Sequence, residues 1–238
     1  HWRGLYHLVH SEPTEVGGDK MKIVQNLVPA SKYSIKCPYS MTPEFIVVHN
    51  TANDASARNE VAYMISNNNQ VSFHYAIDDK EIVQGIPENR NAWHAGDGNN
   101  GPGNRKGIGI EICYSKSGGQ RFIEAEKLAA KFIAYKLKEK GWGIDRVKKH
   151  QDFSGKYCPH RTLDMGWQRF LNMVQAELNA LKGADKVEDK NTPSSWAKEA
   201  WEWAKKEGIT DGTRPKDTMT REEMVTMLHR YHKKVFPK

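Results

Sequence analysis

Cysteine and long apolar runs are both scarce in this sequence of 238 residues. The three cysteines, Cys37, Cys113 and Cys158, are few and odd in number, which argues against a fold held by disulfide bonds. No apolar run approaches the ~20 residues that a membrane-spanning helix requires, so we expect no membrane span. The first twenty residues lack the basic start and uninterrupted apolar stretch of a signal peptide. We therefore expect synthesis in the cytoplasm without a signal peptide.

The sequence does contain enough apolar material for a core, together with an excess of positive charge. Hydrophobic residues make up 38% and charged residues 27%, which is typical of a folded protein rather than a disordered one. The formal net charge of +7 favours an anionic partner, such as nucleic acid, an anionic lipid surface or a cell wall that carries anionic polymers. Because the chain has no recognition-helix motif and no RNA-binding strand signature, we expect no nucleic acid partner.

Residues 21–182 alternate between strand and helix patterns, which indicates an α/β domain. We interpret residues 1–20 as a leader or an added segment that precedes a natural start at Met21. The apolar run over residues 45–48 predicts a buried strand that ends at His49. Further strands are expected over 71–77, 81–83 and 108–113, and helices after Asp54, over 122–140 and over 164–181.

The rest of the chain predicts a linker and a small helical domain. Residues 183–193 are polar and carry no apolar pattern, so we interpret them as a linker. Within residues 194–238, Thr220 and Glu223 fit a capping box at the start of a helix. This helix is expected to bury three apolar side chains, those of Met224, Leu228 and Tyr231. A unit of about 45 residues is marginal by itself, so it should pack on the first domain, on a second copy or on a ligand.

Three candidate metal ligands stand at the ends of predicted elements. His49 closes a strand, His150 ends the segment that leads out of a long helix, and Cys158 follows eight residues later. Zinc accepts imidazole and thiolate ligands, and a catalytic zinc site keeps three protein ligands and one open position. The spacing alone leaves the alternative open, because a single histidine or cysteine is more often a surface or core residue than a ligand.

Four motifs give the chain a family resemblance. They are FIVVHNT at residues 45–51, AWHAG at 92–96, GIGIEI at 107–112 and HQDFSGKYCPHR at 150–161. Together, and in this order, they resemble the type 2 N-acetylmuramoyl-L-alanine amidases, which are related to the peptidoglycan recognition proteins. The resemblance covers residues 21 to about 181 and is strongest to endolysins of Bacillus phages and prophages. It implies a central mixed β-sheet flanked by helices and cleavage of an amide bond in bacterial peptidoglycan.

The resemblance also implies roles for individual residues. The zinc ligands would be His49, His150 and Cys158. Glu111 would be the general base and acid, although an ordinary polar residue on a strand is the alternative. Lys156 would stabilise the oxyanion, although a solvated loop lysine is the alternative. Some family members carry a tyrosine before the hairpin histidine, where this chain has Phe73 before His74, so a tyrosine role is absent and His74 is expected to be structural.

Further residues are expected on the substrate side of the site. His94 lies in the AWHAG loop, Asn50 directly follows a ligand, and Arg105 precedes the strand that carries Glu111. The resemblance implies that these three residues contact the substrate, and a guanidinium suits a peptide carboxylate. Trp93 could belong to the core or form a platform for a sugar, and the sequence leaves both interpretations open.

Residues 194–238 resemble one S-layer homology repeat. Such repeats attach proteins to secondary cell-wall polymers and commonly occur in threes, so a homodimer through this unit would increase its number of copies. The overall prediction is a zinc-dependent phage or prophage endolysin that acts on the bacterial cell wall. The alternatives are a bacterial wall-remodelling autolysin and a non-catalytic peptidoglycan-binding protein, although the presence of Cys158 favours an enzyme.

Overall fold

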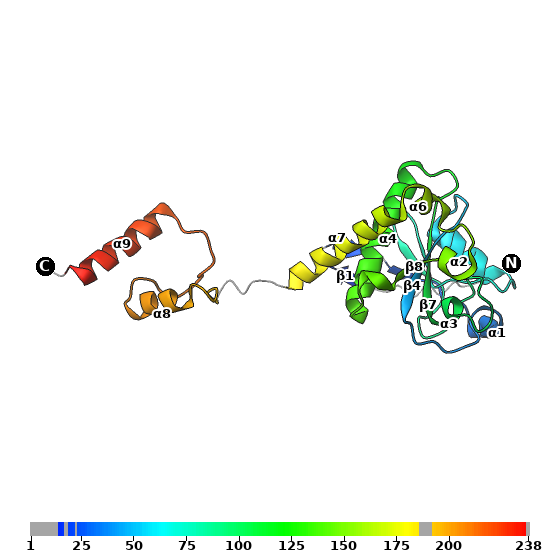
Figure 1. Ribbon diagram of the computed structural model, residues 1–238, viewed down its shortest axis with the longest axis horizontal. Coiled ribbons are helices and arrows are strands. Elements are labelled where there is room, and N and C mark those ends of the chain that lie inside the picture. The colour runs from blue at the N-terminus through cyan, green and yellow to red at the C-terminus, as the bar shows by residue number, and fades with distance from the viewer. Residues whose placement is uncertain (1–13, 17–18, 22, 186–191, 237–238) are drawn as a thin grey trace, which may run out of the picture. The chain divides into compact units, whose positions relative to one another are not determined.

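The computed structural model describes residues 14–16, 19–21, 23–185 and 192–236. The chain divides into two compact units, residues 1–182 and residues 183–238, and each is described by itself (Figure 1). Most of the expected leader and the middle of the expected linker lie outside the described residues, so these boundaries stay predictions. None of the described helices is long and apolar enough to cross a membrane.

A six-stranded mixed sheet forms the centre of the first unit. Each of its six strands runs parallel to at least one neighbour, and within this sheet only β5 and β6 pair antiparallel. A separate hairpin joins β1 (Thr14–Val16) to β2 (Asp19–Met21). The order across the main sheet is β3 (Ile23–Gln25), β6 (Ile82–Gln84), β5 (Tyr75–Ile77), β7 (Gly107–Ile112), β4 (Phe45–Asn50) and β8 (Val147–Lys149).

Helices flank this sheet, which confirms the predicted α/β class with a central mixed sheet (Figure 1). The short ones are η1 (Ala30–Lys32), α1 (Tyr33–Lys36), α3 (Pro102–Lys106), η2 (Ile144–Arg146), α5 (Gln151–Ser154) and α6 (His160–Asp164). The longer ones are α2 (Ala57–Ser66), α4 (Gly119–Lys140) and α7 (Trp167–Asp185).

Glycines mark where the long helices begin or end. Helix α4 ends as predicted, because Gly141 adopts φ 67° and its N–H bonds to the last turn. The long helix predicted over 164–181 is present as α7, which begins three residues later, at Trp167. Gly166 separates α7 from α6 with φ 103°, a conformation that residues with a side chain rarely adopt.

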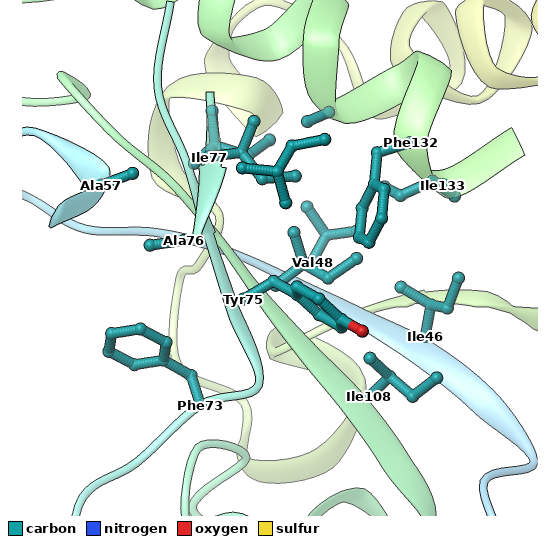
Figure 2. Packing of buried hydrophobic residues seen from close by; sticks show 14 of the residues in the cluster. Ile46, Val48, Ala57, Phe73, Tyr75, Ala76, Ile77, Ile108, Phe132 and Ile133 are labelled. Atoms are coloured by element: carbon teal, nitrogen blue, oxygen red, sulfur yellow. The ribbon is translucent and has the colours of Figure 1, made fainter. Parts of the chain in front are cut away.

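The two faces of the sheet carry different residues, because side chains alternate along each strand. Figure 2 shows Tyr75 on the same side as Phe132 and Ile133 of α4, whereas Ala76 points to the side of Ala57 in α2. The rings of Tyr75 and Phe132 pack edge to face at 4.8 Å. Even-numbered residues of β4 and β7 join this apolar layer under α4; they are Ile46, Val48, Ile108, Ile110 and Ile112. The odd-numbered residues, His49 and Glu111 among them, therefore lie on the opposite face.

A partly buried ion cluster joins helix α4 to the turn after β6. The Glu88 carboxylate lies 3.0 Å from Lys136 Nζ and 2.8 Å from Lys140 Nζ, and it accepts a hydrogen bond of 2.8 Å from the Tyr75 hydroxyl. Burial alone would raise the pKa of Glu88, but the two lysines and the tyrosine outweigh burial and lower it to about 2.

Replacing Glu88 by glutamine is expected to lower the stability of the first unit by about 3 kcal/mol at pH 7, since the pKa falls from 4.5 to about 2 and a difference of one in pKa corresponds to about 1.4 kcal/mol. The folded-state pKa lies below the ordinary value, so this stabilisation is complete above about pH 4.5 and is lost as the pH falls toward 2. Denaturant unfolding at pH 7 and at pH 3 measures the free energy of unfolding of the wild type and of Glu88→Gln, and so tests both the cost and its pH dependence. The matched control is Glu124→Gln in the exposed pair with Lys127, which should cost under about 1 kcal/mol. An equal cost of Glu88→Gln at both pH values would contradict the prediction.

The second unit consists of α8 (Lys198–Lys206), α9 (Arg221–Val235) and the loop between them. The predicted capping box is present, because Thr220 accepts from the Glu223 N–H and the Glu223 carboxylate accepts from the Thr220 N–H. Among residues 192–236, Ile209 is the only buried hydrophobic residue. The predicted burial of Met224, Leu228 and Tyr231 is therefore wrong: their side chains are exposed, because so short a unit has no second layer to cover this side of α9.

Candidate metal centre

The three predicted metal ligands meet at the carboxyl ends of two neighbouring parallel strands. His49 is the fifth residue of β4, and His150 directly follows β8, which pairs in parallel with β4. Cys158 lies in the loop between α5 and α6, and its carbonyl accepts a hydrogen bond from the Gln151 N–H. The parallel register brings together side chains that lie 101 and 109 residues apart in the chain.

The geometry of the three side chains suits a metal ion. Their ligand atoms all lie within 4.8 Å of one another, with Nδ1 of His49 3.0 Å from Nδ1 of His150 and 3.9 Å from Sγ of Cys158. All three residues are buried. Burial lowers the pKa of both imidazoles, so each keeps a lone pair available to a metal at neutral pH. Burial also raises the pKa of the Cys158 thiol to about 11, with the nearby Glu111 carboxylate acting in the same direction.

Two further predicted residues lie at this group. Glu111 in β7 is the direct neighbour of His49 in β4, and its Oε2 atom is buried without a hydrogen-bond partner among the described residues. Burial raises the pKa of Glu111 to about 8; the Glu60 carboxylate adds to the rise and Lys156 opposes it. Lys156 is exposed in the loop before Cys158, and its charge also lowers the pKa of His49 and of His150. The structure thus brings a carboxylate and an ammonium group to the metal ligands.

Comparison with known proteins places this site in a family. Residues 39–161 match the model of the family described as N-acetylmuramoyl-L-alanine amidase. The chain belongs to this family. It is therefore an amidase, and the matched segment contains all three candidate metal ligands together with Glu111 and Lys156.

Relatives of the amidase include two proteins of Bacillus subtilis strain 168 and one solved structure. The chain is 54% identical to the amidase CwlA over 217 residues, which cover 88% of this chain and 78% of CwlA. It is 57% identical to the amidase XlyB over 175 residues, which cover 73% of this chain but only 55% of XlyB. The solved structure of PlyL is 56% identical in sequence. Its superposition covers 65% of this chain and 97% of the PlyL chain, with a TM-score of 0.63.

Two of the three predicted substrate contacts of the amidase have side chains that bond to other parts of the protein. Oδ1 of Asn50 accepts hydrogen bonds from the N–H groups of Arg161 and Thr162, and its Nδ2 donates to the Thr162 hydroxyl. Asn50 therefore joins the end of β4 to α6. The guanidinium of Arg105 stacks on the Tyr39 ring at 4.1 Å and donates to the Asn99 carbonyl. Substrate contact by either residue stays a prediction.

The third predicted contact, His94, lies against a metal ligand. It is buried, and its Nδ1 atom is 3.0 Å from Nε2 of His49. Burial lowers the pKa of His94 to about 3, with His74 contributing in the same direction. The preceding residue, Trp93, belongs to the core, because it is buried and its indole donates to the Ile35 carbonyl.

Sequence analysis missed a residue that holds this loop. The buried Asn104 side chain accepts hydrogen bonds of 2.8 Å from the N–H groups of both His94 and Ala95. Asp97 in turn accepts from the N–H groups of Gly103 and Asn104. The only signal in the sequence is a run of Asn and Gly residues that resembles any surface loop.

Proposed function

We propose that the protein hydrolyses the amide bond between N-acetylmuramic acid and L-alanine in bacterial peptidoglycan, with zinc bound by His49, His150 and Cys158. The observation that carries the proposal is the meeting of these three ligands beside the half-buried carboxylate of Glu111 in an amidase chain. Two imidazoles and one thiolate are ligands that zinc prefers, whereas magnesium and calcium prefer oxygen. Three protein ligands also leave a fourth position for water or substrate.

The residues of the chain supply the proton transfers and the charge that hydrolysis needs. Zinc, when bound, supplies Lewis acidity, which lowers the pKa of water to about 7 and polarises a carbonyl group. We assign to Glu111 the transfer of one proton from the attacking water to the leaving nitrogen, so that the amine departs neutral. Lys156 would stabilise negative charge on the former carbonyl oxygen. Phe73 occupies the position at which some family members carry a tyrosine, so this position supplies no hydroxyl for either task.

The direct test is the release of new amino termini from purified peptidoglycan. We expect one free α-amino group of alanine per bond cut, no increase in reducing sugar ends, and loss of release when a chelator removes the metal. Binding to peptidoglycan without any release would instead support the non-catalytic alternative. Release that persists in chelator, with zinc shown to be absent, would contradict the metal-dependent mechanism.

We propose a role as a phage or prophage endolysin. The layout of a catalytic unit followed by a small helical unit supports this role. A wall-remodelling autolysin of a bacterium is the alternative. Lysis of growing cells on expression together with a membrane-permeabilising protein, but not on expression alone, is the outcome that distinguishes the endolysin from an exported autolysin.

We also propose that the second unit binds a secondary cell-wall polymer, as its likeness to an S-layer homology repeat suggests. A cavity of about 770 Å³ in this unit is lined by Trp201, Arg214 and Arg230, with several threonines around them. The indole offers a face for a sugar ring, and the polar side chains of the lining, which also include Asp211, Asp217, Glu222 and Glu223, offer hydrogen bonds to its hydroxyl groups. The net positive charge of the whole chain favours an anionic polymer.

We propose in addition that α9 pairs with α9 of a second copy. Met224, Leu228, Tyr231 and Val235 are exposed and recur at spacings of four, three and four residues, which is the pattern of a helix–helix seam. The first turn of α9 is acidic and its last turn is basic. An antiparallel pair would place each acidic end beside the partner's basic end, so the face is complementary to itself.

Changing Leu228 to lysine is expected to convert a dimer of the full chain into a monomer, because it places a charge in the middle of the apolar seam. Sedimentation velocity measures the mass, and release of amino termini should stay unchanged. The matched control is His229→Lys, which places the same charge outside the seam on the same helix and should leave the dimer intact. A wild-type chain that sediments as a monomer at tens of micromolar would rule the pairing out.

A further inference from the structure

A short buried loop contacts two of the three metal ligands. The ring of His94 packs edge to face on the ring of His49, with centroids 5.0 Å apart, and Nδ1 of His94 lies 3.0 Å from Nε2 of His49. The backbone of the next residue, Ala95, accepts a hydrogen bond from the imidazole of His150. Residues 94–95 therefore contact both imidazoles that face the metal position, those of His49 and His150.

The position of each hydrogen atom in this chain of contacts follows from its partner. Only Nδ1 of His49 is close to both His150 and Cys158, so Nδ1 must carry the lone pair that binds a metal. The proton of neutral His49 then lies on Nε2 and is donated to Nδ1 of His94. Nδ1 of His94 is thereby an acceptor, and the proton of His94 lies on Nε2. That atom is 3.2 Å from the Gly107 carbonyl, which can only accept.

The sheet leaves a space for His94 at one position. A Cβ atom added to Gly109 would come within 2.8 Å of the His94 ring. The glycine in β7 therefore lets the imidazole lie directly on the strand between Gly107 and His49. This explains the glycine at position 109 of the GIGIEI motif, because the His94 ring fills the space that a side chain there would need.

The backbone around His94 is held independently of the metal ligands. Asn104 accepts from the N–H groups of His94 and Ala95, and the Ser72 N–H donates to the carbonyl of Trp93. These contacts keep the His94 ring in place without any help from His49. The loop is thus able to orient the ligand, rather than being oriented by it.

We propose that His94 is a positioning residue that selects the tautomer of His49 in which Nδ1 is free to bind zinc. This inference rests on the proposed zinc site and extends it by one residue. His94 touches neither the metal nor the reacting bond, and acts through His49. Residues that orient a metal-bound histidine in this way typically contribute about 10–100-fold to metal affinity.

The test compares His94→Asn with His94→Leu, two side chains of nearly equal size. The Asn Oδ1 atom takes the place of Nδ1 and can accept from His49, whereas Leu cannot. Competition with a chromogenic chelator should show zinc affinity reduced about 10–100-fold in His94→Leu and largely retained in His94→Asn. In the metal-free protein, ¹⁵N NMR should show His49 protonated at Nε2 in wild type and His94→Asn, and a mixture of tautomers in His94→Leu.

His74→Leu is the matched control. His74 is a buried histidine that bonds to the Gly109 N–H and the Arg90 carbonyl and contacts no metal ligand. Its replacement should lower thermal stability but leave zinc affinity unchanged. Equal zinc affinity in His94→Leu and wild type, or a loss in His74→Leu as large as that in His94→Leu, would overturn the inference. Because the tautomer is measured without metal or substrate, failure of the amidase assay would bear on the proposed function alone.

Discussion

Replacing Glu111 by glutamine is expected to lower kcat for release of amino termini by about 10²–10⁴-fold, the usual contribution of a general acid–base. Glutamine keeps the size of the side chain but cannot accept the proton of water. Zinc content should not change, because Glu111 is not among the three ligands. Steady-state kinetics on purified peptidoglycan, with zinc measured in the same samples, provides the test.

The half-buried position of Glu111 also predicts how the rate depends on pH. Burial raises the pKa of Glu111 in the metal-free protein to about 8 although Lys156 opposes the rise, and a bound cation would lower it. The acidic limb of the pH–rate profile should therefore report this carboxylate and disappear in Glu111→Gln. Glu124→Gln, on an exposed part of α4, is the control and should keep full activity. A Glu111→Gln enzyme that keeps more than about a tenth of the rate would exclude the general-base role.

The fold and the group of candidate metal ligands could be predicted because both follow from local patterns. The apolar run before His49 marks a buried strand, and Gly141 marks the end of α4. The family motifs then select His49, His150 and Cys158 from ten histidines and three cysteines. The parallel pairing of β4 and β8 is the reason that residues so distant in sequence meet at one edge of the sheet.

The details that the sequence did not reveal depend on contacts between distant segments. A histidine in a loop could face the substrate or the protein, and only the packing of His94 on Gly109 distinguishes the two. Asn50 and Asn104 likewise look like loop residues until their backbone partners are known. The sequence predicts a buried apolar face on α9, whereas this face is exposed in the structure, because amphipathic spacing shows that a helix has an apolar side but not what covers it.

Replacing Cys158 by alanine is expected to remove zinc binding at micromolar metal and to abolish release of amino termini. A structural zinc site with four ligands gains about 10–16 kcal/mol, so one ligand contributes about 3 kcal/mol, or more than 10²-fold in affinity. In the wild type, the metal-free thiol is protonated because burial raises its pKa to about 11. Zinc binding at pH 7 should therefore release about one proton, which calorimetry in two buffers of different ionisation enthalpy measures.

The other two cysteines provide the matched controls for this prediction. Cys37 and Cys113 are also buried and free, but neither belongs to the ligand group. Cys37→Ala should keep zinc affinity, proton release and activity, even though it removes a thiol of the core. Cys158→Ala should lose the proton release together with the affinity, because both depend on the same sulfur atom. If Cys158→Ala retained tight zinc binding with the proton release intact, the thiolate would not be a ligand and the donor set proposed for this site would be incorrect.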